Sequence, residues 1–402
     1  MSHIVVIGAG QAGSSLVAKL RSEGFEGEIT LIGEEASPPY QRPPLSKKYL
    51  TGEMELERLF LRPTAYYADN NIELLLSSAA KSIDPESKTV TVGDREIPYD
   101  QLALTTGSVP RRLPDAIGGG LKGVHVVRGL ADVDAMAPGV ATGKRVLIVG
   151  GGYIGLEAAS VCAKMGMTVT LVEMAERILQ RVACPETSAY FRDLHRAHGV
   201  DIREGVGLER LVGEDHVTGA VLSDGTKLAL DMVIVGVGIA PATELAEEAG
   251  LVVENGIRTD AQGRTSDPSI WAAGDCASLI YKGNRIRLES VQNAIDQAEC
   301  VASNMLGAGK DYAPHPWFWS DQYDVKLQIA GLNTGYDRVV VRPGEGQTVS
   351  HWYYAGDTLL AVDAMNDPRA YMVGKRLLEA GKSPAAEVVA DPETELKALL
   401  RP

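Results

Sequence analysis

The stretch Ile4–Gly13, IVVIGAGQAG, decides how the rest of the chain is interpreted. Its apolar residues Ile4–Ile7 predict a strand, which runs into Gly8-x-Gly10-x-x-Gly13 and then into SSLVAKL, a predicted helix. In a dinucleotide-binding βαβ unit the first glycine allows the tight turn, the second lets a pyrophosphate approach the backbone, and the third lets the helix pack on the strand. The sequence therefore predicts a nucleotide site with the phosphates at the helix N-terminus.

The strand predicted next supports this interpretation. Ile29–Ile32 is apolar and is followed by Gly33 and Glu34. An acidic residue at this place can accept hydrogen bonds from a ribose, so Glu34 is a predicted nucleotide contact.

The chain repeats the whole pattern. Shifted by 142 positions, Ile4–Gly13 falls on Val146–Gly155, and the three glycines coincide with Gly150, Gly152 and Gly155. A helix follows, and then a strand, Thr168–Val172, which ends in Glu173. This internal repeat predicts two bound dinucleotides. The copies differ in one chemical respect, because Ser15 of the first corresponds to Glu157 of the second.

Composition limits the class of protein. The 402 residues predict two to three domains, and a formal charge of −14 argues against a general nucleic-acid binder, which needs a basic surface. The first strand leaves no room for a signal peptide, and no apolar run reaches the ~18 residues of a membrane helix. Four scattered cysteines without a C-x-x-C favour a reducing compartment, so we expect a cytoplasmic protein.

The expected fold class is α/β, with two Rossmann-type dinucleotide-binding domains and a C-terminal α+β domain. Crossings after Gly107 and at Pro241 divide it into 1–110 with 241–314, then 111–240, then 315–402. Within these domains we expect a β-meander over Asp201–Val235, strands at Ile257–Arg264 and Ile270–Asp275, and a helix near Val291–Leu306.

Two nucleotide units in one chain suggest electron transfer between FAD in the first and a nicotinamide dinucleotide in the second. Glu173 predicts NADH, because a carboxylate hydrogen-bonds the ribose 2′-hydroxyl and repels the 2′-phosphate of NADPH, and no arginine follows it. The residues expected at the nicotinamide dinucleotide are Gly150, Gly152, Tyr153, Ile154, Gly155, Glu173 and Gly238.

Several longer motifs carry a resemblance: GAGQAG, RPPLSK, LTTG, GGGYIGLE, DMVIVGVG, AAGDCA and PWFWSDQY. Over essentially its whole length the chain resembles the oxygenase-coupled NADH-dependent ferredoxin reductases, which are glutathione-reductase-like flavoproteins. Thr105 departs from the family, which more often has alanine there, and this difference is expected to be peripheral. The glycine motif predicts FAD contacts at Gly8, Gly10 and Gly13. The resemblance implies further FAD contacts at Ala12, Glu34, Arg42, Lys47, Ala80, Arg128, Asp275 and Val291.

The resemblance also implies that Lys47 pairs with Glu157 beside the flavin N5. A lysine there supplies positive charge where a reduced flavin gathers negative charge, and the carboxylate fixes its position. From the residues alone, a proline-containing surface loop with a solvated lysine stays open for Tyr40–Lys47.

The missing cysteines indicate how electrons leave. Disulfide reductases of this fold need thiols against the flavin, but Gln41–Lys47 contains none, and a thiol such as Cys276 is more often a packing residue. We therefore expect one-electron transfer to a carrier. Trp317 and Trp319 are expected either to cover the flavin, with Trp319 as the predicted FAD contact, or to be core aromatics.

The family's carrier is a small acidic 2Fe-2S ferredoxin that serves a haem monooxygenase or a ring-hydroxylating oxygenase. With a net charge of −14, docking would need a local basic patch, and the candidates are Arg62, Arg287, Lys326, Arg338 and Lys375. His195 and His198 in HRAH are expected to lie on an exposed helix face rather than to bind a metal.

Two alternatives remain open. The first is a rubredoxin, nitrite or monodehydroascorbate reductase on the same scaffold. The second is a flavin redox sensor similar to apoptosis-inducing factor, which would be expected to carry a targeting segment and a basic DNA-binding surface.

Overall fold

A computed structural model describes residues 2–401. By its internal contacts the chain forms two compact units. The first comprises Met1–Arg42, Glu55–Val109 and Ile239–Pro314, and the second comprises Pro43–Met54, Pro110–Gly238 and His315–Pro402. The predicted division into three domains stays a prediction.

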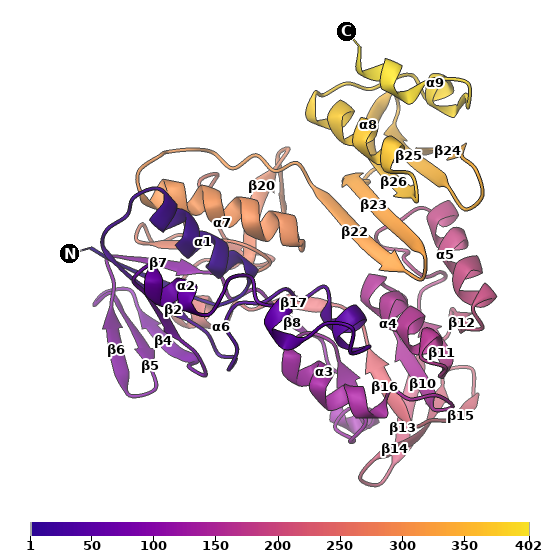
Figure 1. The fold of residues 1–402 in the computed structure, drawn as a ribbon, viewed down its shortest axis with the longest axis horizontal. Helices are drawn as coiled ribbons and strands as arrows, with labels where there is room; N and C mark the ends of the chain where they lie inside the picture. The colour runs from indigo at the N-terminus through magenta and orange to yellow at the C-terminus, as the bar shows by residue number, and fades with distance from the viewer. Residues whose placement is uncertain (1, 402) are drawn as a thin grey trace. The chain divides into compact units, whose positions relative to one another are not determined.

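The first unit is built on a parallel five-stranded sheet in the order β19-β7-β1-β2-β3. Four of the five residues of β1 are buried, as expected for a strand covered on both faces. Helices α1 (Gln11–Ser22) and α7 (Val291–Met305) lie side by side (Figure 1). The strands are β1 (His3–Ile7), β2 (Glu28–Ile32), β3 (Ile72–Leu75), β7 (Gln101–Leu104) and β19 (Ile270–Ala272).

An antiparallel meander, β4-β5-β6, comes between β3 and β7 in the sequence. The predicted strand at Ile257–Arg264 is wrong in length, because only Ile257–Arg258 is a strand. The other elements of this part of the chain are η2 (Leu56–Arg58), α2 (Ala65–Asp69), β4 (Ala80–Asp84), β5 (Thr89–Val92), β6 (Arg95–Pro98), β8 (Ser108–Pro110), β17 (Ile239–Pro241), α6 (Glu244–Glu248), β18 (Ile257–Arg258), β20 (Ala277–Tyr281) and β21 (Asn284–Ile286).

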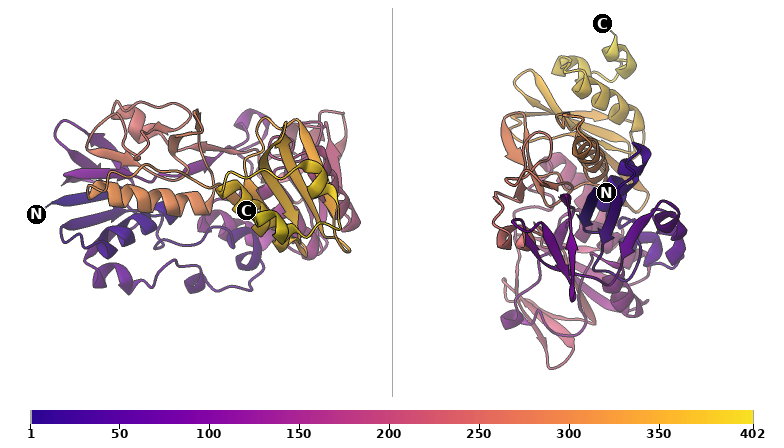
Figure 2. Two further views of the ribbon diagram at one scale, coloured as in Figure 1. Left: turned by 90° about the horizontal axis from the view of Figure 1, so that it is seen from above. Right: turned by 90° about the vertical axis from the view of Figure 1, so that its left-hand side faces the viewer.

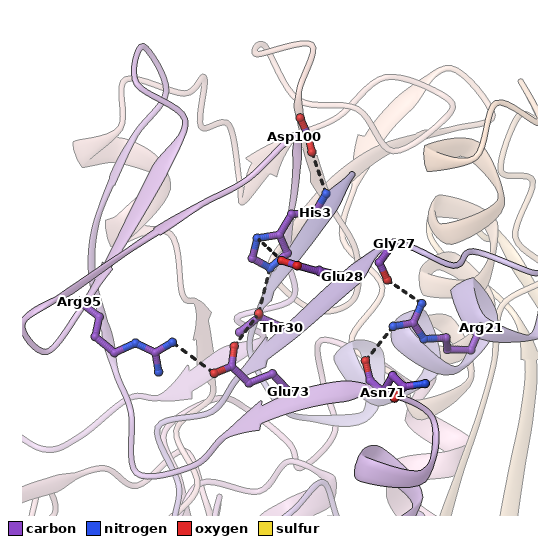
Figure 3. A network of polar contacts seen from close by, with 9 residues as sticks. All are labelled: His3, Arg21, Gly27, Glu28, Thr30, Asn71, Glu73, Arg95 and Asp100. Atoms are coloured by element: carbon purple, nitrogen blue, oxygen red, sulfur yellow. Dashed lines mark hydrogen bonds and ion pairs between the residues drawn. The ribbon is translucent and has the colours of Figure 1, made fainter. Parts of the chain in front are cut away.

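A polar network ties together the starts of the strands, at the edge opposite the glycine turn (Figure 3). The backbone N–H of His3 donates to Asp100 at 2.7 Å, and Thr30 donates to Glu73 at 3.0 Å. Arg21, at the end of α1, donates to the carbonyls of Gly27 at 2.9 Å and Asn71 at 2.8 Å. These contacts fix α1 on the sheet, and so they fix the glycine turn from which α1 starts.

The second unit repeats the architecture. Its parallel sheet has the order β12-β11-β10-β16-β9, so the first four strands correspond to β3, β2, β1 and β7. A meander, β13-β14-β15, stands between β12 and β16, as β4-β5-β6 stands between β3 and β7. The strands are β9 (Val124–Val126), β10 (Arg145–Val149), β11 (Thr168–Glu173), β12 (Asp201–Glu204), β13 (Leu208–Gly213), β14 (Val217–Leu222), β15 (Lys227–Ala229) and β16 (Met232–Val235).

The expectation of one meander over Asp201–Val235 is therefore wrong at both ends. Strands β12 and β16 pair in parallel within the large sheet, and only β13–β15 form the meander. Alternating hydrophobicity detects strands but does not distinguish a hairpin partner from a sheet member.

The C-terminal part of the second unit is an antiparallel sheet, β22-β23-β26-β25-β24, with α8 across one face (Figure 2). Its elements are β22 (Trp317–Gln322), β23 (Val325–Gly331), β24 (Arg338–Pro343), β25 (Val349–Ala355), β26 (Thr358–Met365), α8 (Pro368–Glu379), α9 (Ala386–Ala390) and η5 (Leu396–Leu400). The remaining helices of the unit are η1 (Leu45–Tyr49), η3 (Asp115–Ile117), α3 (Leu130–Met136), η4 (Ala137–Gly139), α4 (Tyr153–Lys164) and α5 (Pro185–Ala197). Within residues 2–401, no helix combines the length and the apolar character that crossing a bilayer requires.

Candidate active site

The first glycine turn has the geometry of a phosphate cradle. Gly8 has φ +111°, and a Cβ on it would lie 2.2 Å from the carbonyl oxygen of Thr105. A Cβ on Gly13 would lie 2.0 Å from the carbonyl oxygen of Gly8, whereas one on Gly10 would meet nothing within 4 Å. The first and third glycines are thus needed for packing, and the second faces open space.

The second turn repeats these distances. A Cβ on Gly150 would lie 2.3 Å from the carbonyl oxygen of Gly236, and one on Gly155 would lie 2.0 Å from that of Gly150. Gly152 has open space. Neither α1 nor α4 has an acidic residue in its first turn or a side-chain N-cap, so their free N–H groups can receive an anion. Both turns fit a dinucleotide pyrophosphate.

The predicted FAD residues of the first unit converge on this turn from distant parts of the sequence. A Cβ on Gly274 would lie 3.1 Å from Cβ of Ala12 and 3.9 Å from Cβ of Ala294, so the turn after β19 meets the first turns of α1 and α7. Asp275 follows and accepts a hydrogen bond from Ser108 at 2.8 Å. Val291 is the first residue of α7. The structure thus brings Ala12, Asp275 and the start of α7 to the glycine turn.

The acidic residue after β2 gains a neighbour that the sequence did not single out. Glu34 is exposed, whereas Glu35 forms an ion pair with Arg42 at 2.5 Å and accepts a hydrogen bond from Tyr40. The segment leading to Ala80 reaches the same loop, because the N–H of Ser77 donates to the carbonyl of Glu35 at 3.0 Å. This geometry fixes Arg42 beside the strand end where a ribose would be expected.

In the second unit, Glu173 is tied to the glycine turn. Its carboxylate accepts hydrogen bonds from the N–H of Gly151 at 2.7 Å and of Ala175 at 2.8 Å, and each oxygen keeps a further lone pair. Ile154 is exposed, whereas the Tyr153 ring packs on Phe318 with centroids 5.0 Å apart. Among the predicted nicotinamide residues, Tyr153 therefore offers its backbone N–H rather than its ring.

Gly238 is the remaining predicted contact of this group. It has φ +100°, and a Cβ there would approach Arg181 at 3.7 Å and Arg111 at 3.9 Å. Two arginine side chains thus lie near the turn after β16, at a backbone conformation that glycine adopts readily and other residues rarely do.

Lys47 and Glu157 form the ion pair that the resemblance implies. Lys47 Nζ donates to Glu157 Oε2 at 2.8 Å, and the two side chains are 20% and 11% exposed. Burial raises the pKa of Glu157, and the neighbouring Lys47 ammonium lowers it. Lys47 interrupts η1 with non-helical φ −129° and ψ −109°, so the backbone itself directs this lysine. Of the two interpretations of the loop, the solvated lysine is wrong.

Arg128 and Trp319 belong to the second unit, as Lys47 does. Arg128 stands between β9 and α3, and its N–H donates to Asp132 at 3.1 Å. The Trp319 ring lies 5.5 Å from that of Trp317. Because side chains alternate along β22, Trp319 faces away from Ser320, which donates to Glu157 Oε1 at 2.8 Å.

Several residues near these groups were missed or misplaced from the sequence. The expectation that both histidines of HRAH lie on an exposed face is wrong for His195, which is fully buried and hydrogen-bonded to Gln322 at 2.8 Å; His198 is exposed. Thr105 is not peripheral, since its hydroxyl donates to the carbonyl of Gly8 at 2.8 Å. The available signal was the run of polar residues Ser320–Gln322 directly after three aromatic residues. Among residues 2–401, no cluster of three or more His, Cys, Asp or Glu could hold a metal.

Residues 2–298 match the family model described as pyridine nucleotide-disulphide oxidoreductase, and residues 317–400 match that described as reductase C-terminal. The chain belongs to the pyridine nucleotide-disulphide oxidoreductase family. Within this family it is 43% identical to a ferredoxin–NAD(P)+ reductase of a Sphingomonas species, over 99% of this chain and 98% of the relative. It is 40% identical to putidaredoxin reductase of Pseudomonas putida, over 99% of this chain and 96% of the relative.

A solved structure of the family agrees with these relatives. The crystal structure of the covalent putidaredoxin reductase–putidaredoxin complex matches with a TM-score of 0.96 and 38% identity, covering 99% of this chain and 98% of that chain. The resemblance to ferredoxin reductases and the predicted fold class are therefore confirmed. Despite the family's name, all four cysteines here are free thiols, and Cys162, Cys184 and Cys276 are buried.

Proposed function

We propose that this protein is an NADH-dependent ferredoxin reductase that contains FAD. The observation that carries the proposal is the pair of glycine cradles, together with a buried Lys47–Glu157 ion pair in a chain whose relatives are named ferredoxin reductases. Bound FAD would take a hydride from NADH and pass the two electrons singly to a 2Fe-2S ferredoxin, which supplies a haem monooxygenase or a ring-hydroxylating oxygenase.

Each cradle is assigned one nucleotide. The first-unit residues Gly8, Gly10, Ala12 and Gly13 would hold the FAD pyrophosphate against the α1 N-terminus, with Asp275 and Arg42 orienting the ribityl and ribose parts. The turn Gly150–Gly155 would hold that of NADH at the α4 N-terminus in the same way.

Lys47 has an electrostatic role in this proposal. Its ammonium, held by Glu157 at 2.8 Å, is a preorganised positive charge for the negative charge that a reduced flavin gathers. Neither residue acts as a nucleophile. Because η1 fixes the lysine backbone, little reorganisation is needed when the charge develops.

Glu173 would select NADH over NADPH. Two backbone hydrogen bonds hold the carboxylate at the glycine turn. There it would accept a hydrogen bond from a ribose 2′-hydroxyl and repel a 2′-phosphate. We expect kcat/KM to be higher for NADH than for NADPH. Glu173→Ala should reduce the ratio of the two kcat/KM values by a factor equivalent to about 1–3 kcal/mol. Glu173→Gln, which keeps the size but removes the charge, separates repulsion of the phosphate from the hydrogen bond. A wild-type preference for NADPH would contradict this assignment.

The ferredoxin is identified by direct transfer. Purified protein with NADH should reduce an acidic 2Fe-2S ferredoxin from the same genome much faster than a rubredoxin. If rubredoxin is the faster acceptor, the alternative reductase on the same scaffold is correct. Sluggish turnover with every carrier would instead favour a redox sensor.

Docking is proposed to be electrostatic. Of the candidate basic residues, Arg287, Arg338 and Lys375 form ion pairs with Glu289, Glu387 and Glu379, so part of their charge is already matched, whereas Lys326 is exposed. Ferredoxin reduction should fall with added salt, and reduction of a neutral dye should not. Equal responses would exclude a charged docking surface. Because the cysteines are free thiols, we also propose the cytoplasm as the compartment.

A further inference from the structure

Strand β22 places alternate side chains against two helices of the same unit. Phe318 packs on Tyr153, Ser320 bonds to Glu157, and Gln322 bonds to His195. Tyr153 and Glu157 are four residues apart on α4 and so share a helix face, while His195 comes from α5. Alternate residues of β22 thus face side chains of α4 and α5 in turn. The polar residues among them form a line through the interior, where Ser320, Gln322 and His195 are all 0% exposed.

The line is a continuous hydrogen-bond chain. Ser320 Oγ lies 2.8 Å from Glu157 Oε1, and Gln322 Nε2 lies 3.2 Å from Ser320 Oγ. Gln322 Oε1 lies 2.8 Å from His195 Nε2, and His195 Nδ1 lies 3.4 Å from the Tyr323 hydroxyl. At the other carboxylate oxygen, Lys47 Nζ completes the sequence at 2.8 Å.

Chemistry fixes the direction of the chain. A Glu157 carboxylate accepts only, so the single hydroxyl proton of Ser320 must point to it. Ser320 Oγ then accepts from the Gln322 amide NH₂, which turns the amide oxygen toward His195. That oxygen needs a donor, so His195 carries its proton on Nε2, and its Nδ1 accepts from Tyr323. Every donor points toward Glu157, and bonds aligned in this way polarise one another.

We propose that Ser320, Gln322 and His195 form a directed donor chain that keeps Glu157 ionised and thereby fixes the Lys47 ammonium. The chain deepens the proposed function and rests on it, because the charge it controls is the one assigned to flavin reduction. Gln322 and His195 are positioning residues that act through Ser320, and His195 is the distal one.

The donor chain matters because the groups around Glu157 shift its pKa in opposite directions. Burial raises the pKa of this carboxyl; Lys47 from η1 lowers it, Ser320 lowers it through its hydrogen bond, and Asp321 on β22 raises it. A hydrogen bond to a carboxylate is about twice as strong as a neutral one, so one donated bond can decide the balance.

The distal end is held neutral. Burial lowers the pKa of His195 to about 4, with Gln322 opposing and His198 adding to the shift. The other groups there are Tyr323, on which His198 stacks at 3.7 Å, and Lys164, whose Nζ lies 5.8 Å from the Tyr323 ring centre. A neutral imidazole with its proton on Nε2 is the form that the chain requires.

The test uses the FAD-loaded protein without NADH or ferredoxin. Glutamate side chains are labelled with ¹³C, the Glu157 signal is assigned by its loss in Glu157→Gln, and its titration is followed by NMR. Ser320→Ala and Gln322→Leu should raise the titration midpoint of Glu157 by about one pH unit or more. Ser320→Thr, which keeps the hydroxyl, should restore it. An unchanged midpoint in Ser320→Ala, which removes one atom and is the mildest variant, would overturn the proposal.

His351 is the matched control, because it is a buried histidine in the same unit whose hydrogen-bond partners are Thr187, at 2.7 Å, and Cys184, at 3.9 Å. His351→Gln should leave the Glu157 titration unchanged, whereas His195→Phe should shift it. ¹⁵N NMR should show His195 neutral and protonated on Nε2 between about pH 6 and 9. The other tautomer would also overturn the proposal of a directed donor chain. The flavin midpoint potential should shift in Ser320→Ala and not in His351→Gln. If Ser320→Ala shifts the Glu157 titration but the unsubstituted protein reduces no ferredoxin, the proposed function is refuted and the proposed donor chain is supported.

Discussion

The two units share a sheet order and a glycine turn but differ in what they bury. Among the described residues, the polar side chains buried in the first unit are uncharged amides and hydroxyls, such as Ser15, Thr105 and Asn293. The buried acidic and imidazole side chains, Glu157, His195, His351 and Asp363, all lie in the second unit. Of these four, Glu157 on α4 and His195 on α5 belong to the repeated part, whereas His351 and Asp363 lie on β25 and β26 of the C-terminal sheet. The second copy of the fold therefore buries titratable side chains where the first copy buries uncharged ones.

Among the changes that test this difference between the units, removing Lys47 from its ion pair with Glu157 should have the largest effect on stability. Lys47→Met leaves the Glu157 carboxylate buried without its partner, so we expect a loss of about 3–5 kcal/mol in the free energy of unfolding near pH 8. Without Lys47, only the Ser320 hydrogen bond opposes the rise that burial causes in the pKa of Glu157. The folded state then binds a proton more readily, so the loss should shrink as pH falls. Denaturant unfolding measures both.

The control lies at the matching position of the first copy. Ser15→Ala should cost less than about 1 kcal/mol, and Lys47→Met with Glu157→Leu should cost less than Lys47→Met alone. If Lys47→Met and Ser15→Ala lowered the free energy of unfolding equally, the two copies would not differ in this respect.

The first glycine of each turn separates the two nucleotides. Gly8→Ala and Gly150→Ala each force a Cβ to about 2 Å from a carbonyl oxygen at a positive φ, which should cost about 3 kcal/mol. Gly8→Ala should lose the flavin absorbance, whereas Gly150→Ala should stay yellow but bind NADH weakly. Flavin content and NADH titration measure this, with Gly10→Ala and Gly152→Ala as variants that do not strain the fold. A colourless Gly150→Ala that still bound NADH would reverse the assignment.

As pH falls, the second unit should lose stability before the first unit does. Burial lowers the pKa of His195 and of His351 to about 4, so the unfolded state, with pKa near 6.5, binds more protons between these values. Their stabilisation is complete above about pH 6.5 and is lost as pH falls toward 4, by about 3 kcal/mol each. Two carboxyl groups act in the opposite direction and offset part of the loss: Asp363, whose pKa burial raises to about 6, and Glu157, whose pKa burial also raises.

Hydrogen exchange near pH 4.5 and pH 7 checks this prediction. Protection should fall in the strands of the second unit and persist in β1 and β2, and His351→Gln should reduce the dependence on pH. Equal loss of protection in the two units would show that the buried histidines do not set the acid response.

The smallest effect is expected at the first helical residue of the second copy. The Tyr153 hydroxyl is buried and has no hydrogen-bond partner among the described residues, whereas the first copy has Gln11 at this position. Tyr153→Phe should therefore change stability by less than about 1 kcal/mol, or increase it, in thermal unfolding. A large loss would mean that the hydroxyl has a partner in solution.

The sequence was sufficient where one residue type has one physical meaning. The glycine triplets predicted both turns, because only glycine tolerates the close backbone approach at the first and third positions. The motif resemblance predicted the Lys47–Glu157 pair. It was insufficient where tertiary contacts decide. The same alternating pattern serves a meander in β13–β15 and a parallel sheet in β12 and β16. His195 on α5 looked solvated because its partner, Gln322, lies far along the chain.

The order of the strands has a consequence for synthesis. Strand β7 pairs with β1 on one side and with β19 on the other, and the chain between Leu104 and Ile270 must be made before that second side is covered. At ribosomal rates this takes on the order of ten to thirty seconds. During this interval β7 is an open edge strand whose unpaired N–H and C=O groups can pair with strands of neighbouring chains. A chaperone that shields β7 until β19 arrives would therefore raise the yield of folded protein.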